Sequence, residues 1–201
     1  MNTSFSDLEV EKQAELLKWL VEIGDFLAEK FSIHASINIH NSFIEPNTGR
    51  ETFIKIISQA KTPMTFEFTE TFKMPPADVS NAILRKVREL GHRSGLDDFG
   101  TGLNGMSLLI NYDFDVIKLD RILTLNVETS EKKAKVLSLI FEMLTVLDKQ
   151  HVVEGVETEE VFKKLKQIGF TTFQGFYFSK PIPVSEFVKA KESEKTHEIS
   201  N

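Results

Sequence analysis

Hydrophobic and polar positions along the chain follow two periods, one typical of helices and one typical of strands. Near the start, leucine and isoleucine recur every few positions among charged residues, which predicts a helix over residues 6–31. Residues 64–70 alternate β-favouring side chains with polar ones, which predicts a strand. Further short runs are β-favouring and predict strands at 36–39, 94–98, 116–119, 151–153 and 172–178.

Helical segments separate these predicted strands. Ser80 is suited to cap a helix that Gly91 ends, because serine accepts from free helix amides and glycine tolerates the turn that follows a helix. A polar loop containing Pro46 precedes a short helix at 51–59. The polar residues 189–201 predict a frayed tail. The other helices are expected to end near Tyr112, to span 130–149 and 159–168, and to begin near Val184.

The alternation of strands and helices over residues 32–188 predicts an α/β fold with mainly parallel strands. Together with the first helix, over residues 1–31, these units form one expected domain over residues 1–188, since a chain of 201 residues suits a single core. A closed barrel of eight strand–helix units usually needs about 250 residues, so the predicted strands fit an incomplete barrel. A doubly wound open sheet is the alternative.

Composition and charge exclude several classes of protein. The chain has no cysteine, which excludes disulfides and thiolate metal sites. Its net charge of −6 and pI near 5.5 argue against binding to a nucleic-acid polymer, which needs basic side chains to neutralise phosphates. The sequence has no apolar run near the ~18 residues of a membrane span and no basic-then-apolar leader at its start. A cytoplasmic protein without membrane association is therefore expected.

Polar or ionisable side chains stand at the carboxyl end of every predicted strand. They are Asn38, Glu67 with Glu70, Asp97 with Asp98, Lys118 with Asp120, Glu154 with Glu157, and Gln174. Barrel enzymes draw their catalytic groups from this end of several strands. Carboxylate and amide oxygens suit hard cations such as Mg²⁺ or Mn²⁺, and adjacent aspartates can hold two such ions for phosphodiester cleavage.

Each of these residues alone also has an ordinary structural interpretation. An aspartate after a strand commonly caps the next helix, which applies to Asp97 and Asp98. Lys118 taken alone is a typical surface charge. The combination is more specific than its parts, because all the strand ends carry groups of suitable chemistry. Within it, Lys118 is suited to neutralising a phosphate and Glu154 to acting as a general base.

Six short strings contain the residues at the strand ends: Ser36-Ile37-Asn38, Phe66-Glu67-Phe68, Leu96-Asp97-Asp98, Ile117-Lys118-Leu119, Val153-Glu154-Gly155 and Phe173-Gln174-Gly175. In their order and spacing these strings resemble the EAL domain family of bacterial cyclic-di-GMP phosphodiesterases. The resemblance covers about residues 15–188. It implies a TIM-like (β/α) barrel and the hydrolysis of cyclic di-GMP to linear pGpG by water that divalent metal ions activate.

The resemblance also implies a two-metal site that takes Mg²⁺ or Mn²⁺. By this analogy Asn38, Glu67 and Asp97 are metal ligands, and Asp98 serves the second ion. These assignments come from the family pattern and not from the spacing of the residues.

The same analogy implies roles for the remaining motif residues. Lys118 positions water or phosphate, Glu154 acts as the base, and Gln174 belongs to the metal and water network. The implied active-site loop contains Glu70, Gly100 and Gly102, where glycine permits sharp turns close to a ligand.

The sequence departs from the family pattern at its start. Family members begin with two strands, the second of which ends in Glu-Ala-Leu, and neither strand is expected here. Ala14-Glu15-Leu16 lies in the predicted first helix and is not counted as a match. The expected barrel therefore lacks about its first two strands and one metal-ligating glutamate.

Two expectations about partners and activity follow from this departure. A homodimer, or a partner chain that supplies the strands, would complete the barrel. An inactive module that binds cyclic di-GMP or another protein is the alternative to an enzyme. An unrelated α/β metal phosphoesterase is a third interpretation.

Overall fold

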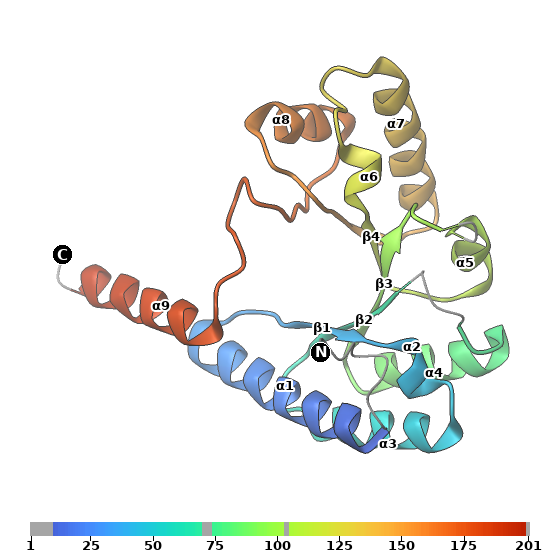
Figure 1. Ribbon diagram of the computed structural model, residues 1–201, viewed down its shortest axis with the longest axis vertical. Helices are drawn as coiled ribbons and strands as arrows, with labels where there is room; N and C mark the ends of the chain where they lie inside the picture. Colours follow the sequence, from blue (N-terminus) through green and yellow to red (C-terminus); the bar gives the residue numbers. More distant parts are fainter. Residues whose placement is uncertain (1–9, 70–73, 103–104, 200–201) are drawn as a thin grey trace, which may run out of the picture.

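The computed structural model describes residues 10–69, 74–102 and 105–199, and in these ranges one sheet of parallel strands forms (Figure 1). The strands are β1 (Ser36–Ile39), β2 (Thr65–Thr69), β3 (Arg93–Phe99), β4 (Val116–Leu119) and β5 (Gln150–Val153). Their order in the sheet is their order in the chain. Doubly wound sheets reverse their strand order, so this sequential winding favours a barrel-type arrangement over the doubly wound alternative.

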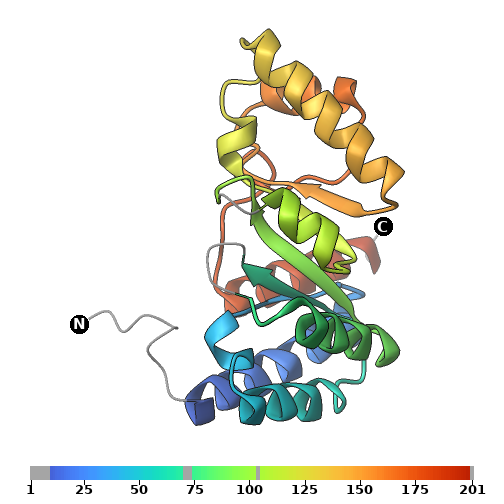
Figure 2. The same ribbon diagram turned by 90° about the vertical axis from the view of Figure 1, so that its right-hand side faces the viewer.

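Helices cover one side of the curved sheet, and the connection from α8 to α9 crosses the opposite side (Figures 1 and 2). The covering helices are α1 (Val10–Phe31), α3 (Asn47–Ile57), α4 (Ala77–Glu89), α5 (Gly105–Asn111), α7 (Glu131–Val146) and α8 (Glu159–Ile168). The short helices α2 (Asn41–Ile44) and α6 (Arg121–Thr124) directly follow β1 and β4. The predicted α/β architecture with parallel strands is confirmed.

The prediction of a strand at 172–178 is wrong. The structure has one isolated bridge there, between Phe173 and the end of β5, and the chain then turns. In that turn the amide of Phe178 donates to the carbonyl of Gly175 at 3.1 Å. The aromatic side chains of the segment cluster with Phe162 of α8 instead of alternating across a sheet. The aromatic composition that favours strands here serves packing against a helix.

Two predicted starts of helices also differ from the structure. Ser80 does not cap α4, because that helix already begins at Ala77, and Ser80 Oγ donates from inside it to the carbonyl of Pro75 at 2.9 Å. The loop predicted around Pro46 is helical on both sides, since α2 precedes it and α3 follows it. A proline before a helix costs no bond within that helix, because the first amides of any helix have no intrahelical acceptor.

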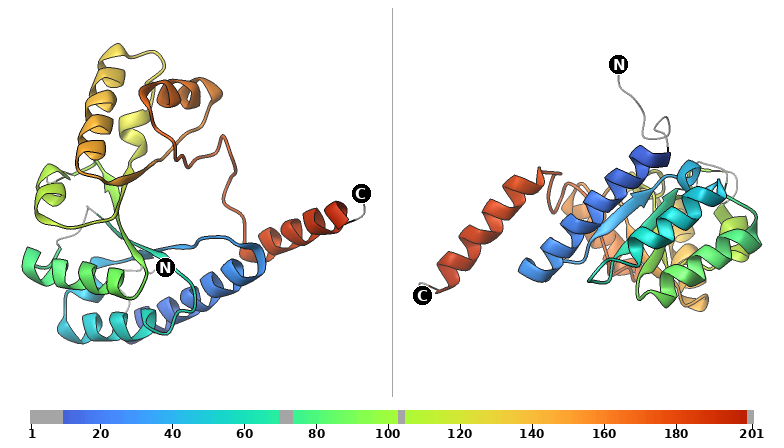
Figure 3. Two further views of the ribbon diagram at one scale, coloured as in Figure 1. Left: turned by 180° about the vertical axis from the view of Figure 1, so that it is seen from behind. Right: turned by 90° about the horizontal axis from the view of Figure 1, so that it is seen from below.

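Helix α9 (Val184–Ile199) starts beside the end of α1 (Figures 1 and 3). The rings of Phe31 and Phe187 meet edge to face at 6.4 Å, and Lys30 forms an ion pair with Glu192. The helix continues through the segment 189–199, which the sequence predicts to be frayed. Lysine, glutamate and alanine are strong helix formers, so a polar composition there is compatible with a helix.

The core lies between the sheet and its covering helices. Phe53 of α3 packs edge to face on Phe66 and Phe68 of β2, with ring centroids 5.5 and 6.0 Å apart, and all three side chains are fully buried. Strand β2 is buried on both faces, so Glu67, whose side chain points to the face opposite Phe66 and Phe68, is also buried. None of the helices in the described ranges has the length and apolar character needed to cross a membrane.

Candidate active site

The ammonium of Lys118 lies at the centre of a cluster of carboxylates. Its Nζ is 2.8 Å from Glu67 Oε2, 2.8 Å from Asp97 Oδ1 and 2.7 Å from Glu154 Oε1. The partners come from β2, from β3 and from the residue after β5, so the parallel strands deliver them to one place. An ammonium has three donors, and here three carboxylates surround it.

A glycine leaves room for this convergence. Gly95 of β3 pairs with Glu67 on one side and with Val116 of β4 on the other. A Cβ at Gly95 would stand 3.3 Å from Glu67 Cγ. Because position 95 carries no side chain, Glu67 reaches across β3 to the lysine of β4.

Burial and charge act on the pKa of Lys118 in opposite directions. Burial lowers the pKa of the ammonium, but the carboxylates of Glu67, Asp97 and Glu154 outweigh burial and raise the pKa above its ordinary value. Lys118 is therefore charged at neutral pH. Asp98 adds a fourth carboxylate close to Asp97 and Glu154, so one ammonium stands among four carboxylates and the site has an excess of negative charge.

Asp98 has a backbone conformation that is uncommon for a residue with a side chain. Its φ is 58°, in the left-handed region. The pairing of β3 with β4 shifts register between Leu96 and Phe99, and this irregularity contains both aspartates of the site. The carboxylate oxygens of Asp97, Asp98 and Glu154 consequently lie within 4.8 Å of one another. Backbone outliers of this kind cluster at functional sites.

The backbone of Glu154 is fixed from two sides. Its amide donates to the carbonyl of Leu119 at 2.9 Å, and its carbonyl accepts from Thr124 Oγ1 at 3.1 Å. Burial raises the pKa of the Glu154 carboxyl, while the Lys118 ammonium opposes that rise. A carboxyl with a raised pKa holds a proton more readily than an ordinary one, which suits a general base.

A pocket of about 680 Å³ opens beside this cluster at the β1 side of the sheet. Asn38 lines it, and so do Glu67, Asp97 and Asp98. Asn38 pairs in register with Glu67, which explains why the amide and the carboxylate share one wall. Apolar side chains from α1 and β1 complete the lining, among them Leu16, Leu20, Ile37 and Ile39.

Gln174, Gly100 and Gly102 belong to segments that adjoin the cluster in sequence. Gln174 bonds through its backbone to Val153 and Val156, at 2.8 and 3.1 Å, and its side chain is exposed. Gly100 has a φ of 104°, and a Cβ there would be 2.7 Å from Leu123 Cδ1, so both conformation and space require glycine. Gly102 lies in the bend that follows it. Glu70 lies outside the described residues.

Sequence reasoning assigned no role to Arg121 and Thr124 of α6. Thr124 holds the carbonyl of Glu154, as described above. Arg121 packs over Gly155, where a Cβ would stand 2.3 Å from Arg121 Cγ, and its Nε is 3.0 Å from Glu157 Oε1. The only sequence signal is position, because Arg121 directly follows the Lys118–Asp120 motif. The sequence also did not reveal that Leu16 lines the pocket, because a helical pattern of leucines does not show which pocket each side chain lines.

The donor atoms of the site fit hard divalent cations. The grouped ligand atoms of Asp97, Asp98 and Glu154 are all carboxylate oxygens, and the excess of negative charge requires a counter-cation. Oxygen ligands of this kind suit Mg²⁺ and Mn²⁺. Glu154 belongs to this group although the sequence analysis made it a base and not a ligand.

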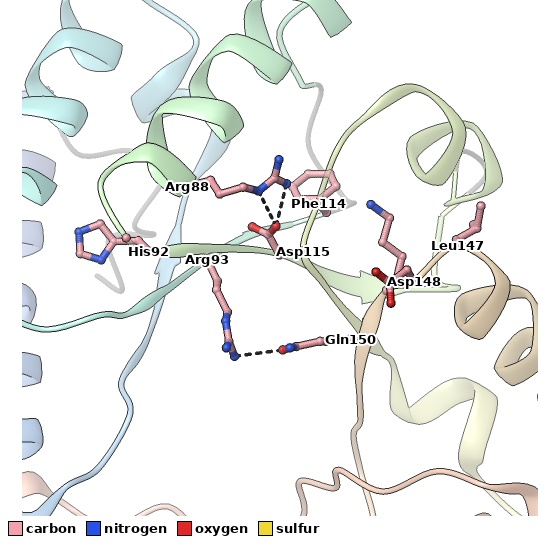
Figure 4. A pocket seen from close by; sticks show the side chains of 10 residues that line it. Arg88, His92, Arg93, Phe114, Asp115, Leu147, Asp148 and Gln150 are labelled. Atoms are coloured by element: carbon pink, nitrogen blue, oxygen red, sulfur yellow. Dashed lines mark hydrogen bonds and ion pairs between the residues drawn. The ribbon is translucent and has the colours of Figure 1, made fainter.

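A second pocket, of about 490 Å³, lies at the opposite end of the strands (Figure 4). Arg88 Nη2 is 2.7 Å from Asp115 Oδ1 there, and Arg93 Nη1 donates to Gln150 Oε1 at 3.0 Å. Arg88 thus binds Asp115, and the contact between Arg93 and Gln150 joins the starts of β3 and β5. The pocket contains none of the residues predicted for the site.

The EAL domain is the protein family whose model matches this chain, over residues 5–181. One similar curated protein is the cyclic di-GMP phosphodiesterase RocR of Pseudomonas aeruginosa, which is 29% identical over 161 residues. The alignment covers 78% of this chain and 41% of that protein, so the chain spans less than half the length of this relative.

Solved structures give the same likeness in three dimensions. The EAL domain of Mycobacterium smegmatis DcpA superposes with a TM-score of 0.80 at 24% identity, over 89% of this chain and 82% of that one, and shows the fold alone. Klebsiella pneumoniae BlrP1, in a complex with manganese and cyclic di-GMP, superposes with a TM-score of 0.70 at 27% identity, over 86% of this chain and 44% of that one.

Proposed function

Because this chain belongs to the EAL domain family of cyclic-di-GMP phosphodiesterases, we propose that it carries the site for metal-dependent hydrolysis of cyclic di-GMP to linear pGpG. The observation that carries the proposal is the convergence of Glu67, Asp97 and Glu154 on Lys118, with Asp98 close to Asp97 and Glu154. A hydrophobic core does not need four carboxylates at one place, whereas carboxylates gathered in this way suit the divalent cations that assist phosphodiester cleavage.

In this proposal the carboxylates and the amide of Asn38 hold two ions of Mg²⁺ or Mn²⁺. Asp97 would be a ligand together with Asn38 and Glu67 from the neighbouring strands, and the adjacent Asp98 would serve the second ion. When bound, the ions supply a water of lowered pKa and neutralise charge on the phosphate.

In this proposal Glu154 transfers a proton and Lys118 supplies a positive charge. Glu154 accepts the proton of the attacking water, and its raised pKa makes it a better acceptor than an ordinary glutamate. Lys118, which is charged, orients that carboxylate and faces the phosphate. Gln174 and the loop of Glu70, Gly100 and Gly102 border the substrate.

A second candidate is a module that binds cyclic di-GMP or a protein without cleaving it. The observation in its favour is that the sequence contains no Glu-Ala-Leu string, so one family ligand for the metal ions is not supplied by any residue named here. The pocket of 680 Å³ lies beside β1, which pairs with β2 on one side. In this proposal strands from an upstream segment or a partner chain, including a second copy, complete the barrel next to this pocket.

One experiment separates the two candidates. The purified chain is incubated with cyclic di-GMP and Mn²⁺, with and without an added N-terminal EAL segment, and pGpG is measured by chromatography. Turnover that a chelator and Glu154→Ala both abolish supports the enzyme. Binding of cyclic di-GMP without pGpG in both incubations contradicts the enzyme and supports the module. The control is Glu157→Ala, because Glu157 is half-exposed and pairs with Arg121 instead of Lys118.

A further inference from the structure

We propose that Lys118 is the resident counter-cation of the carboxylate cluster and that a divalent ion must compete with it for the same carboxylates. This inference rests on the proposed function, because it assumes that the cluster binds metal. It gives Lys118 a task in metal binding that is separate from any contact with substrate.

Lys118 contacts carboxylates from three segments of the sheet. Each of Glu67, Asp97 and Glu154 places an oxygen within 2.8 Å of Nζ. The residue is 6% exposed, so water has little access to the ammonium. A buried ammonium with three charged partners holds those partners together, since each carboxylate would otherwise repel the other two.

Two of these partners are also the groups that can ligate a metal ion. Asp97 and Glu154 belong with Asp98 to the group of carboxylates whose oxygens lie within 4.8 Å of one another. An ion held by this group would share ligands with the ammonium and so lie close to it. Two positive charges that lie close together in a buried site repel strongly. Ion binding therefore has to loosen at least one contact of Lys118.

Competition of this kind has two measurable consequences. Without the ammonium, the carboxylates repel one another, so the protein is less stable in the absence of metal. The same change removes the competitor, so a divalent ion binds more tightly. A lysine that merely packs in the core would produce the first effect without the second.

The test uses Lys118→Met, which keeps most of the volume and removes the charge. Binding of MnCl₂ is measured by calorimetry, and the thermal midpoint is measured with chelator and with Mn²⁺. We expect Mn²⁺ affinity to rise by about tenfold or more, a lower midpoint with chelator, and a larger upward shift on adding Mn²⁺ than in the unmodified protein. The control is Lys163→Met, because Lys163 is largely exposed and pairs with Glu159 on its own helix.

The outcomes separate this inference from the proposed function. If the unmodified chain binds no Mn²⁺, the proposed function fails. If the unmodified chain binds Mn²⁺ and Lys118→Met binds it equally or more weakly, the competition is overturned. If Lys118→Met does not fold with chelator present, the double variant Lys118→Met with Glu67→Gln is compared with Glu67→Gln alone. The double variant removes one charge of each sign and is expected to fold. Tighter Mn²⁺ binding by the double variant than by Glu67→Gln supports the competition, and equal or weaker binding, or failure to fold, overturns it.

Discussion

Lys118 Nζ lies 2.8 Å from Glu67 Oε2 although 51 positions separate the two residues in sequence, and their strands are not neighbours in the sheet. The contact passes over β3 at Gly95, the residue that pairs with Glu67. A carboxylate and an ammonium can meet across an intervening strand only if that strand presents no side chain between them. The glycine is therefore part of the site although it carries no functional group.

We predict that substitution of Gly95 disturbs the site in proportion to the size of the new side chain. A Cβ at this position would stand 3.3 Å from Glu67 Cγ, which Gly95→Ala can accommodate with a small shift. Gly95→Val adds two methyl groups to that Cβ and is expected to lower the free energy of unfolding by about 1–3 kcal/mol. Urea unfolding measures this, and Mn²⁺ affinity should fall in the same order. Equal effects of alanine and valine would contradict the steric argument.

Substitution of Glu154 is predicted to remove hydrolysis without unfolding the protein. Glu154→Gln keeps the shape of the side chain but cannot accept a proton, so pGpG formation should fall by about 10²–10⁴-fold. Circular dichroism and the thermal midpoint check that the fold persists. The matched control is Glu157→Gln, which changes a half-exposed carboxylate three positions away and should retain most activity. Comparable losses in both variants would argue against a base at position 154.

Gly175 is predicted to be intolerant of any side chain. A Cβ there would stand 2.1 Å from the carbonyl oxygen of Val156, and a backbone atom cannot rotate away. Gly175→Ala should therefore lower the free energy of unfolding by at least about 2 kcal/mol and displace the adjacent Gln174. Gly91→Ala is the comparison, because Gly91 has a φ of 84° but no atom within 4 Å of its Cβ position. Its cost is only backbone strain, about 1–2 kcal/mol. A larger loss for Gly91→Ala would refute the steric argument.

The sequence predicted the sheet better than it predicted the site. Strand 116–119 has the predicted limits, and the helix after Ser130 begins where its hydroxyl accepts from the amide of Lys133. Both signals are local, since hydrophobic runs and caps depend on neighbouring residues. The strand expected at 172–178 does not form, because its aromatic residues pack against Phe162 of α8. A local strand pattern does not reveal this contact with another element.

The contacts within the site could not be read from local patterns. The sequence placed Glu67, Asp97, Lys118 and Glu154 at strand ends, but which of them touch depends on the register of three strand pairs. The register shift beside Asp98, with its φ of 58°, has no local signal, because aspartate is only modestly enriched in that conformation. The distribution of partners around one lysine is thus a property of the folded sheet.

The stability of the protein is predicted to depend on pH through His151. Its ring packs edge to face against Phe141 and Phe170, with centroids 5.5 and 5.2 Å away, and these two rings also contact each other. Burial lowers its pKa below the ordinary 6.5, and a backbone contact at Lys149 partly opposes this. Below 6.5 the unfolded chain binds a proton that the folded chain does not, so the free energy of unfolding falls as the pH falls.

His151→Phe removes this titrating group while keeping an aromatic ring against the two phenylalanines. Its free energy of unfolding, relative to that of the unmodified chain, should therefore rise as the pH is lowered from about 8 to about 5. The ring is only partly buried, so solvent screening keeps the gain under roughly 1 kcal/mol. Urea unfolding of both proteins at each pH gives the comparison, and the other histidines cancel because both proteins contain them. A stability difference that is constant across this range would mean that His151 titrates with the same pKa in both states, and the account of its burial would be wrong.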